Sequence, residues 1–92
     1  MLSSYKIHLM FFYVYLICTI NSKGNLISYV GYTNNVKKRL SFHNQGKGAK
    51  FTRGRRWKLL YKKRFLTKKK AMQFEYVLKK DRIKRNKIKS RF

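Results

Sequence analysis

The alternation of apolar and polar positions along the chain predicts three short β-strands. Residues 11–19 are apolar on both parities, which is typical of a strand covered on both faces. The polar cluster at residues 21–25 predicts a turn, so that residues 26–32 form the return strand of a hairpin. Residues 57–66 alternate, which predicts an edge strand with one wet face. Its expected covered face holds Trp57, Leu59, Tyr61 and Phe65, and its expected exposed face holds Lys58, Lys62 and Arg64.

Two further segments carry helix signals at their ends. Asn34 or Asn35 is suited to cap a helix that runs to about Gln45, and Gly46 is placed to end it in the left-handed conformation. Thr67 is suited to cap a second helix that runs to about residue 80. The resulting β-β-α-β-α order predicts a small α/β (α+β) domain with three strands.

The chain divides into three segments around one small domain. Residues 1–10 are expected to be an N-terminal extension, and residues 11–80 to be the folded domain. Residues 81–92 are mostly cationic, which predicts either a helical extension or a frayed tail. Within the domain, residues 46–56 hold three glycines and five cations without an apolar period, so a mobile basic loop is expected there.

The charge of the chain points to a polyanionic partner. Lys and Arg number 25 against 2 Asp and Glu among 92 residues, a net charge of +23. Because 43% of the residues are apolar and 16% are aromatic, the chain is a folded domain rather than a disordered basic tail. Such a domain is expected to bind nucleic acid. The expected phosphate-contacting residues lie in the loop and the C-terminal segment: Lys47, Lys50, Arg53, Arg55, Arg56, Lys84, Arg85 and Lys87.

The scarcity of acids and cysteines excludes several kinds of site. The acids, Glu75 and Asp81, are too few for a calcium cage or a carboxylate-rich two-metal centre, so a single-metal site is the most that this chain supports. With one cysteine, Cys18, the chain has neither a disulfide framework nor a zinc ribbon. Cys18 lies in an apolar run and is expected to be a small core residue.

The apolar run at residues 9–20 has a second interpretation as a membrane or targeting segment. Its twelve residues fall short of the roughly 17–25 that a spanning helix needs. It could pass as the apolar part of a signal peptide, but no small-residue cleavage site follows it. Its aromatic and β-branched residues favour a buried strand, and we expect no membrane association and no secretion.

Chemistry-bearing side chains are expected to converge beside the hairpin. Tyr15 and Tyr29 can lie on one face of the paired strands, next to Gly31. At about 100° per residue, Arg39 and His43 border the apolar stripe of the first helix one turn apart. Glu75 borders the core face of the last helix by the same geometry, as an inward-facing carboxylate that could bind a metal. The alternative for Glu75 is an ion pair with Lys79 or Arg82.

Together these motifs resemble the GIY-YIG nucleases over about residues 11–80. The resemblance implies that family's fold, a small three-stranded mixed sheet flanked by helices, which matches the β-β-α-β-α order. The resemblance rests on their order and spacing, Tyr13-Val14-Tyr15, Tyr29-Val30-Gly31, Lys38-Arg39-Leu40 and His43-Asn44. Gly46-Lys47-Gly48-Ala49, Thr52-Arg53-Gly54-Arg55 and Gln73-Phe74-Glu75-Tyr76 are similar to the catalytic subunit of Slx-type structure-specific endonucleases and to small bacterial relatives. Departures are Tyr13 in place of the family's glycine, Tyr32 where some members have lysine, and the missing zinc-binding domain of the Slx-type subunit.

The resemblance implies a role for each matching residue. Tyr15 and Tyr29 would be the motif tyrosines, with Tyr29 favoured as the base that takes a proton from the attacking water. Arg39 would pair with the phosphoryl oxygens, and Glu75 would hold Mg²⁺ (or Mn²⁺). His43 would either share the proton transfer or orient the phosphate.

The implied function is a metal-dependent endonuclease that hydrolyses phosphodiester bonds in DNA. Branched or structured DNA in repair or recombination would be its substrate, RNA stays open, and a protein partner could supply the targeting. Such a protein would be intracellular, in the cytoplasm, the nucleoid or another compartment that contains DNA. The alternative is a non-catalytic basic nucleic-acid-binding protein on the same fold. The inward-facing tyrosines, arginine, histidine and glutamate favour the enzyme, because binding alone does not need them.

Overall fold

The computed structural model describes residues 10–92, so most of the expected N-terminal extension lies outside the described residues. The elements follow the predicted order, with one 3₁₀ turn and one helix more. They are β1 (Phe12–Ile20), β2 (Leu26–Thr33), α1 (Val36–Asn44), η2 (Lys50–Thr52), β3 (Lys58–Phe65), α2 (Lys68–Lys80) and α3 (Arg82–Lys89). Within residues 10–92, no helix has the length and apolar character needed to cross a bilayer.

The sheet has the strand order β2-β1-β3, and β1 pairs with both neighbours in antiparallel orientation. The α+β class and the three strands are therefore as predicted, whereas the expectation of a mixed sheet is wrong. The chain crosses from β2 through α1 to β3, which lies on the far side of β1. The strands β2 and β3 thus run in the same direction, but β1 separates them and no parallel pair forms.

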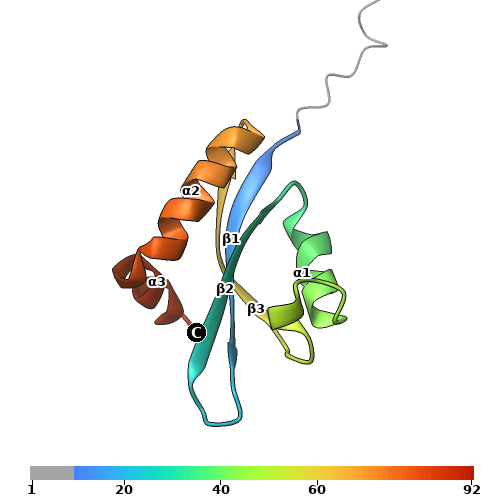
Figure 1. Cartoon of the computed structure of the whole chain (residues 1–92), viewed down its shortest axis with the longest axis vertical. Helices are drawn as coiled ribbons and strands as arrows, with labels where there is room; N and C mark the ends of the chain where they lie inside the picture. The colour runs from blue at the N-terminus through green and yellow to red at the C-terminus, as the bar shows by residue number, and fades with distance from the viewer. Residues whose placement is uncertain (1–9) are drawn as a thin grey trace, which may run out of the picture.

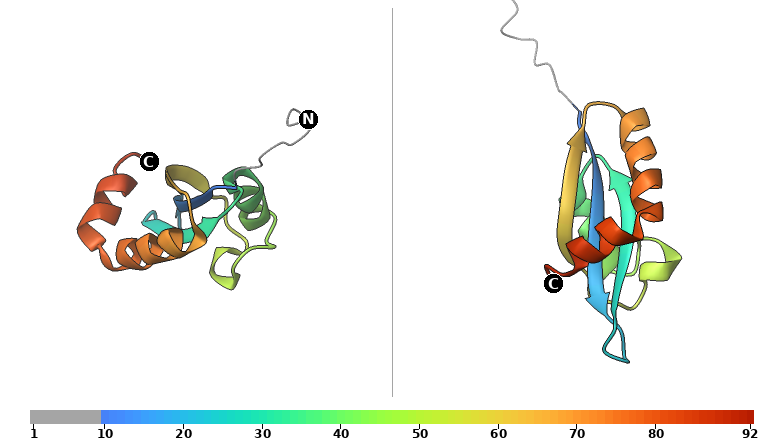
Figure 2. Two further views of the ribbon diagram at one scale, coloured as in Figure 1. Left: turned by 90° about the horizontal axis from the view of Figure 1, so that it is seen from above. Right: turned by 90° about the vertical axis from the view of Figure 1, so that its left-hand side faces the viewer.

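Helices cover both faces of this sheet. Figures 1 and 2 show α1 and η2 on one face, and α2 and α3 on the other. Residues of β1 alternate between the two layers, as predicted for a strand that is apolar on both parities. Val14, Leu16 and Cys18 pack with the α2 and α3 side, whereas Tyr15 and Ile17 pack with the α1 side. Cys18 is fully buried, and this burial raises the pKa of its thiol, as suits a core residue.

The edge strand β3 departs from the predicted alternation. Leu16 pairs with Tyr61 and Ile17 with Leu59, so Leu60 is an extra residue in a β-bulge. A bulge reverses the parity of the side chains beyond it. Leu59 therefore packs with the α1 side together with Trp57, whereas Tyr61 and Phe65 pack on the opposite face. The expectation that these four residues share one covered face, opposite a wet face, is wrong for this reason.

Local capping sets the ends of the helices. The Asn35 side chain accepts a hydrogen bond from the Lys38 backbone N–H at 3.0 Å, and Thr67 accepts one from Lys70 at 3.1 Å. Gly46 follows α1 with a φ of 75°, in the left-handed region. Residues 82–89 form a helix, α3, whose Ile88 is 3% exposed and joins the core beneath α2.

Candidate active site

The hairpin brings the two motif tyrosines together over Gly31. Tyr15 pairs directly with Gly31 across the strands, and Tyr29, two residues before Gly31, lies on the same face. The two tyrosine rings lie 6.5 Å apart between centroids. A Cβ atom on Gly31 would lie 2.5 Å from the Tyr15 hydroxyl oxygen, so only glycine leaves room for the phenol above the backbone.

A buried hydrogen-bond chain fixes the Tyr15 hydroxyl. Its oxygen lies 2.8 Å from His43 Nε2, and His43 Nδ1 lies 2.8 Å from the Thr52 hydroxyl oxygen. The Thr52 hydroxyl donates its single hydrogen to the Ala49 carbonyl at 2.8 Å, so it can only accept from Nδ1–H. Nε2 of the neutral imidazole is then the acceptor, and Tyr15 is the donor.

Burial governs the protonation of this chain. His43 is 1% exposed, and its burial, together with the charge of Arg39, lowers its pKa, which keeps the imidazole neutral. Burial likewise raises the pKa of the Tyr15 phenol; nearby Tyr29 and Glu75 add to the rise, and Arg39 opposes it. Tyr15 is therefore held as a neutral phenol whose proton points at His43.

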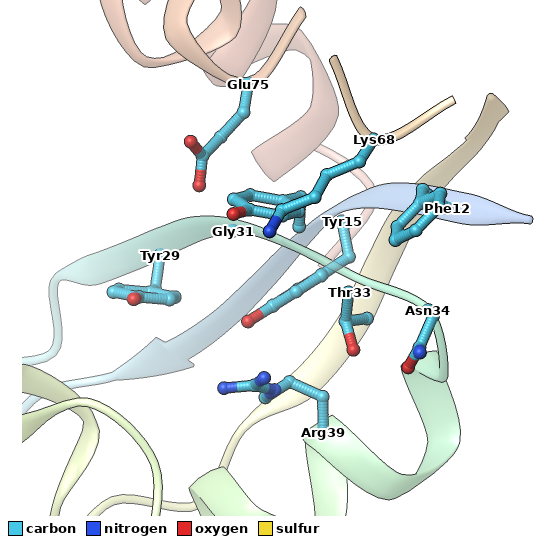
Figure 3. A pocket seen from close by; sticks show the side chains of 10 residues that line it. Phe12, Tyr15, Tyr29, Gly31, Thr33, Asn34, Arg39, Lys68 and Glu75 are labelled. Carbon is cyan, nitrogen blue, oxygen red and sulfur yellow. The ribbon is translucent and has the colours of Figure 1, made fainter. Parts of the chain in front are cut away.

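These side chains border a pocket of about 550 Å³ at the end of the sheet where β1 begins and β2 ends. Tyr15, Tyr29, Arg39 and Glu75 all line it, although they come from four different elements. Figure 3 shows the polar ends of these side chains directed toward one common space. His43 does not line the pocket and lies behind Tyr15, so direct contact between His43 and a bound phosphate is not what this geometry provides.

Glu75 is the acidic side chain of this pocket. Its side chain is 18% exposed and pairs with Lys79 at 3.5 Å, so the predicted ion pair is present, and the same side chain lines the pocket. Among residues 10–92, no group of three or more His, Cys, Asp and Glu side chains gathers to form a metal cage. A single carboxylate suits Mg²⁺, which keeps several waters and uses one or two carboxylates together with substrate phosphates.

Two residues of the site were not predicted from the sequence. Lys68, the first residue of α2, lines the pocket, and Figure 3 shows its amine pointing inward from the side of Glu75. Thr52 is fully buried and holds the far nitrogen of His43. The position of Lys68 just after the cap residue Thr67, seven residues before Glu75, places it on the same helix face as Glu75 and was the available signal. Thr52 belongs to the motif at residues 52–55, but nothing in the sequence indicates its contact with His43.

The basic loop is more structured than predicted. Residues 50–52 form the 3₁₀ turn η2, and the Trp57 indole N–H donates to the Thr52 carbonyl at 3.0 Å. The Asn44 side chain spans the base of the loop, accepting from the Trp57 N–H at 2.6 Å and donating to the Trp57 carbonyl at 3.2 Å. The loop cations remain available to a ligand: Lys47, Lys50, Arg53 and Arg56 are exposed, and Arg55 is partly exposed.

The C-terminal cations differ from one another in their surroundings. Lys84 lies over the rings of Tyr61 and Phe74, at 5.8 and 5.1 Å from their centroids. Arg85 donates to the carbonyls of Leu78 and Lys79 at the end of α2. Lys87 is exposed. Lys84 and Arg85 therefore hold α3 against its neighbours, and of the three only Lys87 is fully open to a phosphate.

The model of the GIY-YIG catalytic domain matches residues 11–89 of this chain. The chain therefore belongs to the GIY-YIG family of nucleases, as the motifs predicted. The match includes all of α3, the helix whose Ile88 completes the core.

The chain is similar to small bacterial proteins of the group UPF0213. It is 60% identical over 53 residues to one from Bacillus licheniformis, which covers 56% of this chain and 55% of the relative. It is 53% identical over 70 residues to one from Bacillus velezensis, which covers 75% and 65%. A solution NMR structure of a UPF0213 protein from Bacillus halodurans is 40% identical, with 88% and 84% coverage and a TM-score of 0.47. The chain thus spans roughly half to two thirds of the length of the curated relatives that it matches.

Proposed function

We propose that this protein is a metal-dependent endonuclease that hydrolyses phosphodiester bonds in DNA. The observation that supports the proposal is the convergence of two phenols, a guanidinium and a carboxylate on one pocket of about 550 Å³. A protein that only binds nucleic acid would need neither a fixed phenol nor an inward carboxylate beside its cationic surface. Within DNA, we propose branched or otherwise structured molecules, such as those handled in repair or recombination, as the substrate.

Arg39 would bind oxygens of the reacting phosphate directly, and Glu75 would bind the phosphate through a metal ion. The Arg39 guanidinium lines the pocket from α1 and can donate two parallel hydrogen bonds to phosphoryl oxygens. Glu75 would hold Mg²⁺ or Mn²⁺ from α2. It would give up its ion pair with Lys79, which contributes little stability because the Lys79 side chain is half exposed. When bound, the cation stabilises the negative charge that develops on the phosphate and the leaving oxygen.

The two tyrosines would orient and deprotonate the attacking water. The Tyr15 hydroxyl donates its hydrogen bond to His43, so the lone pairs of the Tyr15 oxygen are free to accept a hydrogen bond from that water. Tyr29 lines the same pocket, and we assign it as the group that accepts the proton of the water. Tyr29 would accept this proton as a phenolate, having released its own proton beforehand, and a guanidinium and a divalent cation would stabilise that anion.

His43 would act as a positioning residue rather than as a contact to substrate. Its ring is packed between Tyr15 and Tyr29, at 5.8 and 5.1 Å between centroids, and bonds Tyr15 from behind. Of the two roles considered for His43, orientation of the phosphate is not supported by this geometry. The hydrogen bond would instead keep the Tyr15 oxygen in the orientation that the water requires.

The experiment is cleavage of labelled branched, flapped and linear DNA with Mg²⁺ or Mn²⁺ by the wild type and by Glu75→Gln. Glu75→Gln should lose cleavage and keep binding within about twofold, because the remaining cations still hold the phosphates. The matched control is Lys79→Ala, which removes the ion-pair partner and should keep cleavage. Equal cleavage by Glu75→Gln and the wild type would contradict the assignment of Glu75. Binding without cleavage by the wild type would favour the non-catalytic alternative.

A further inference from the structure

An aromatic ring stands half exposed at the side of the pocket. Phe51, in η2, is 50% exposed, although phenylalanine is among the residues most often buried. Its ring stacks on Tyr29 with 6.3 Å between centroids and 21° between planes. Because Tyr29 lines the pocket, the exposed part of Phe51 lies one ring away from the space assigned to the reacting phosphate.

The position of Phe51 is fixed by its neighbours. The next residue, Thr52, is fully buried and bonded to His43, so the backbone at Phe51 is tied to the interior. Trp57 supports the ring from the base of the loop, with 6.1 Å between centroids. Arg55 donates from Nε to the Phe51 carbonyl at 3.2 Å and places its guanidinium 5.2 Å from the ring centroid. The exposure of Phe51 is thus a feature of an ordered turn.

The charges around Phe51 indicate which class of ligand binds beside the ring. Residues 46–56 carry five cations and no acid, so a partner at this surface is polyanionic. An aromatic face framed by Lys and Arg matches a nucleic-acid strand, in which a flat base and a phosphate occur together. A base on the ring would take the place of the Arg55 guanidinium, whose N–H groups can then contact the neighbouring phosphate.

We propose that Phe51 is a stacking platform for one unpaired nucleobase beside the phosphate that enters the pocket. In the interior of a paired duplex, neighbouring base pairs cover both faces of each base, so within a strand only an unpaired base can lie on the ring. The inference rests on the proposed function, because only a nuclease has a cleavage position. It specifies the substrate class as a nucleic acid with an unpaired nucleotide at that position. The cations hold the backbone, and Phe51 distinguishes an unpaired nucleotide from a paired one.

The test is a binding comparison in EDTA, so that no cleavage occurs. Fluorescence anisotropy would measure the dissociation constants of three labelled probes: a twelve-nucleotide thymidine strand, an abasic strand of the same length and charge, and a twelve-base-pair blunt duplex. Phe51→Ala should weaken binding of the thymidine strand between about 5-fold and 100-fold. The same variant should bind the abasic strand and the duplex within about twofold of the wild type, because neither offers a free base.

Two further variants separate stacking from packing. Phe51→Trp should keep the preference for the thymidine strand, whereas Phe51→Leu fills the space beside Tyr29 without an aromatic face and should lose most of it. The matched control is Tyr76→Ala, which removes an aromatic side chain that is 60% exposed on α2 and should leave all three constants unchanged.

Specific outcomes would overturn the inference. It fails if Phe51→Ala leaves the thymidine strand unaffected, or if it weakens the abasic strand or the duplex as much as the thymidine strand. The latter result would mean that Phe51 only shapes the loop. Since no cleavage is measured, failure of the nuclease proposal would leave the binding result unchanged, and the two proposals can be judged separately.

Discussion

Acidification below pH 6.5 should destabilise this protein through His43. The unfolded chain holds a histidine of ordinary pKa, near 6.5, whereas burial and Arg39 lower the pKa of His43 in the fold. Below pH 6.5 the unfolded state therefore binds more protons than the folded state, and stability falls with falling pH. The stabilisation is fully present above pH 6.5. If the folded imidazole stays neutral, the free energy of unfolding drops by about 1.4 kcal/mol between pH 7.5 and 5.5.

The measurement is urea unfolding, followed by circular dichroism at closely spaced pH values, without nucleic acid. His43→Gln should be less stable at neutral pH and should show a flatter profile, because the group that titrates only in the unfolded state is gone. Titration of the imidazole resonances in the wild type by NMR gives a second measurement that does not need a folded variant. A His43 resonance that titrates at or above pH 6.5, or an unchanged slope in His43→Gln, would refute the reasoning.

Three further predictions follow from the pocket and the loop. Arg39→Ala and Tyr29→Phe should each lower the cleavage rate about 10²-fold or more with an unchanged circular dichroism spectrum; equal loss of fold and rate would make them structural. Gly31→Ala should displace the Tyr15 phenol and lower the cleavage rate at least tenfold with little change in affinity, as single-turnover assays would detect. If about 6–8 phosphates are neutralised, log K should fall with log[salt] at a slope of roughly −5 to −7. Charge reversal at Lys47 and Lys50 should flatten this slope by about one unit per lost contact and leave the cut position unchanged; a shifted cut would contradict non-specific anchoring.

Features with a local cause were predictable from the sequence. The caps Asn35 and Thr67, the turn before β2 and the left-handed Gly46 each depend on residues within a few positions. The placement of Tyr15 and Tyr29 on one face followed from the strand parity on the two arms of one hairpin. Arg39 and Glu75 line the same pocket. This was predictable because helical periodicity and the family motifs indicate the same inward faces for both residues.

Features that depend on long-range pairing were not predictable. The bulge at Leu60 arises from the register between β1 and β3, which no local pattern encodes. Thr52 meets His43 only because the loop folds back under Trp57, and the motif at residues 52–55 does not reveal that contact. The spacing of Lys68 from Glu75 was a usable signal, but only packing distinguishes Lys68 from the many other lysines of this basic chain.

The two faces of the sheet bury different amounts of apolar surface, and the smaller layer sets the temperature at which the pocket loses its shape. Among the described residues, the α2 and α3 side has seven buried core residues, and the α1 side has four. Local opening requires less free energy where less apolar surface is buried, so amide hydrogens of α1 should exchange with solvent before those of α2. The pocket takes Arg39 from the smaller layer and Glu75 from the larger one. Heat should therefore inactivate the protein by loosening the α1 layer while the sheet and α2 are still folded.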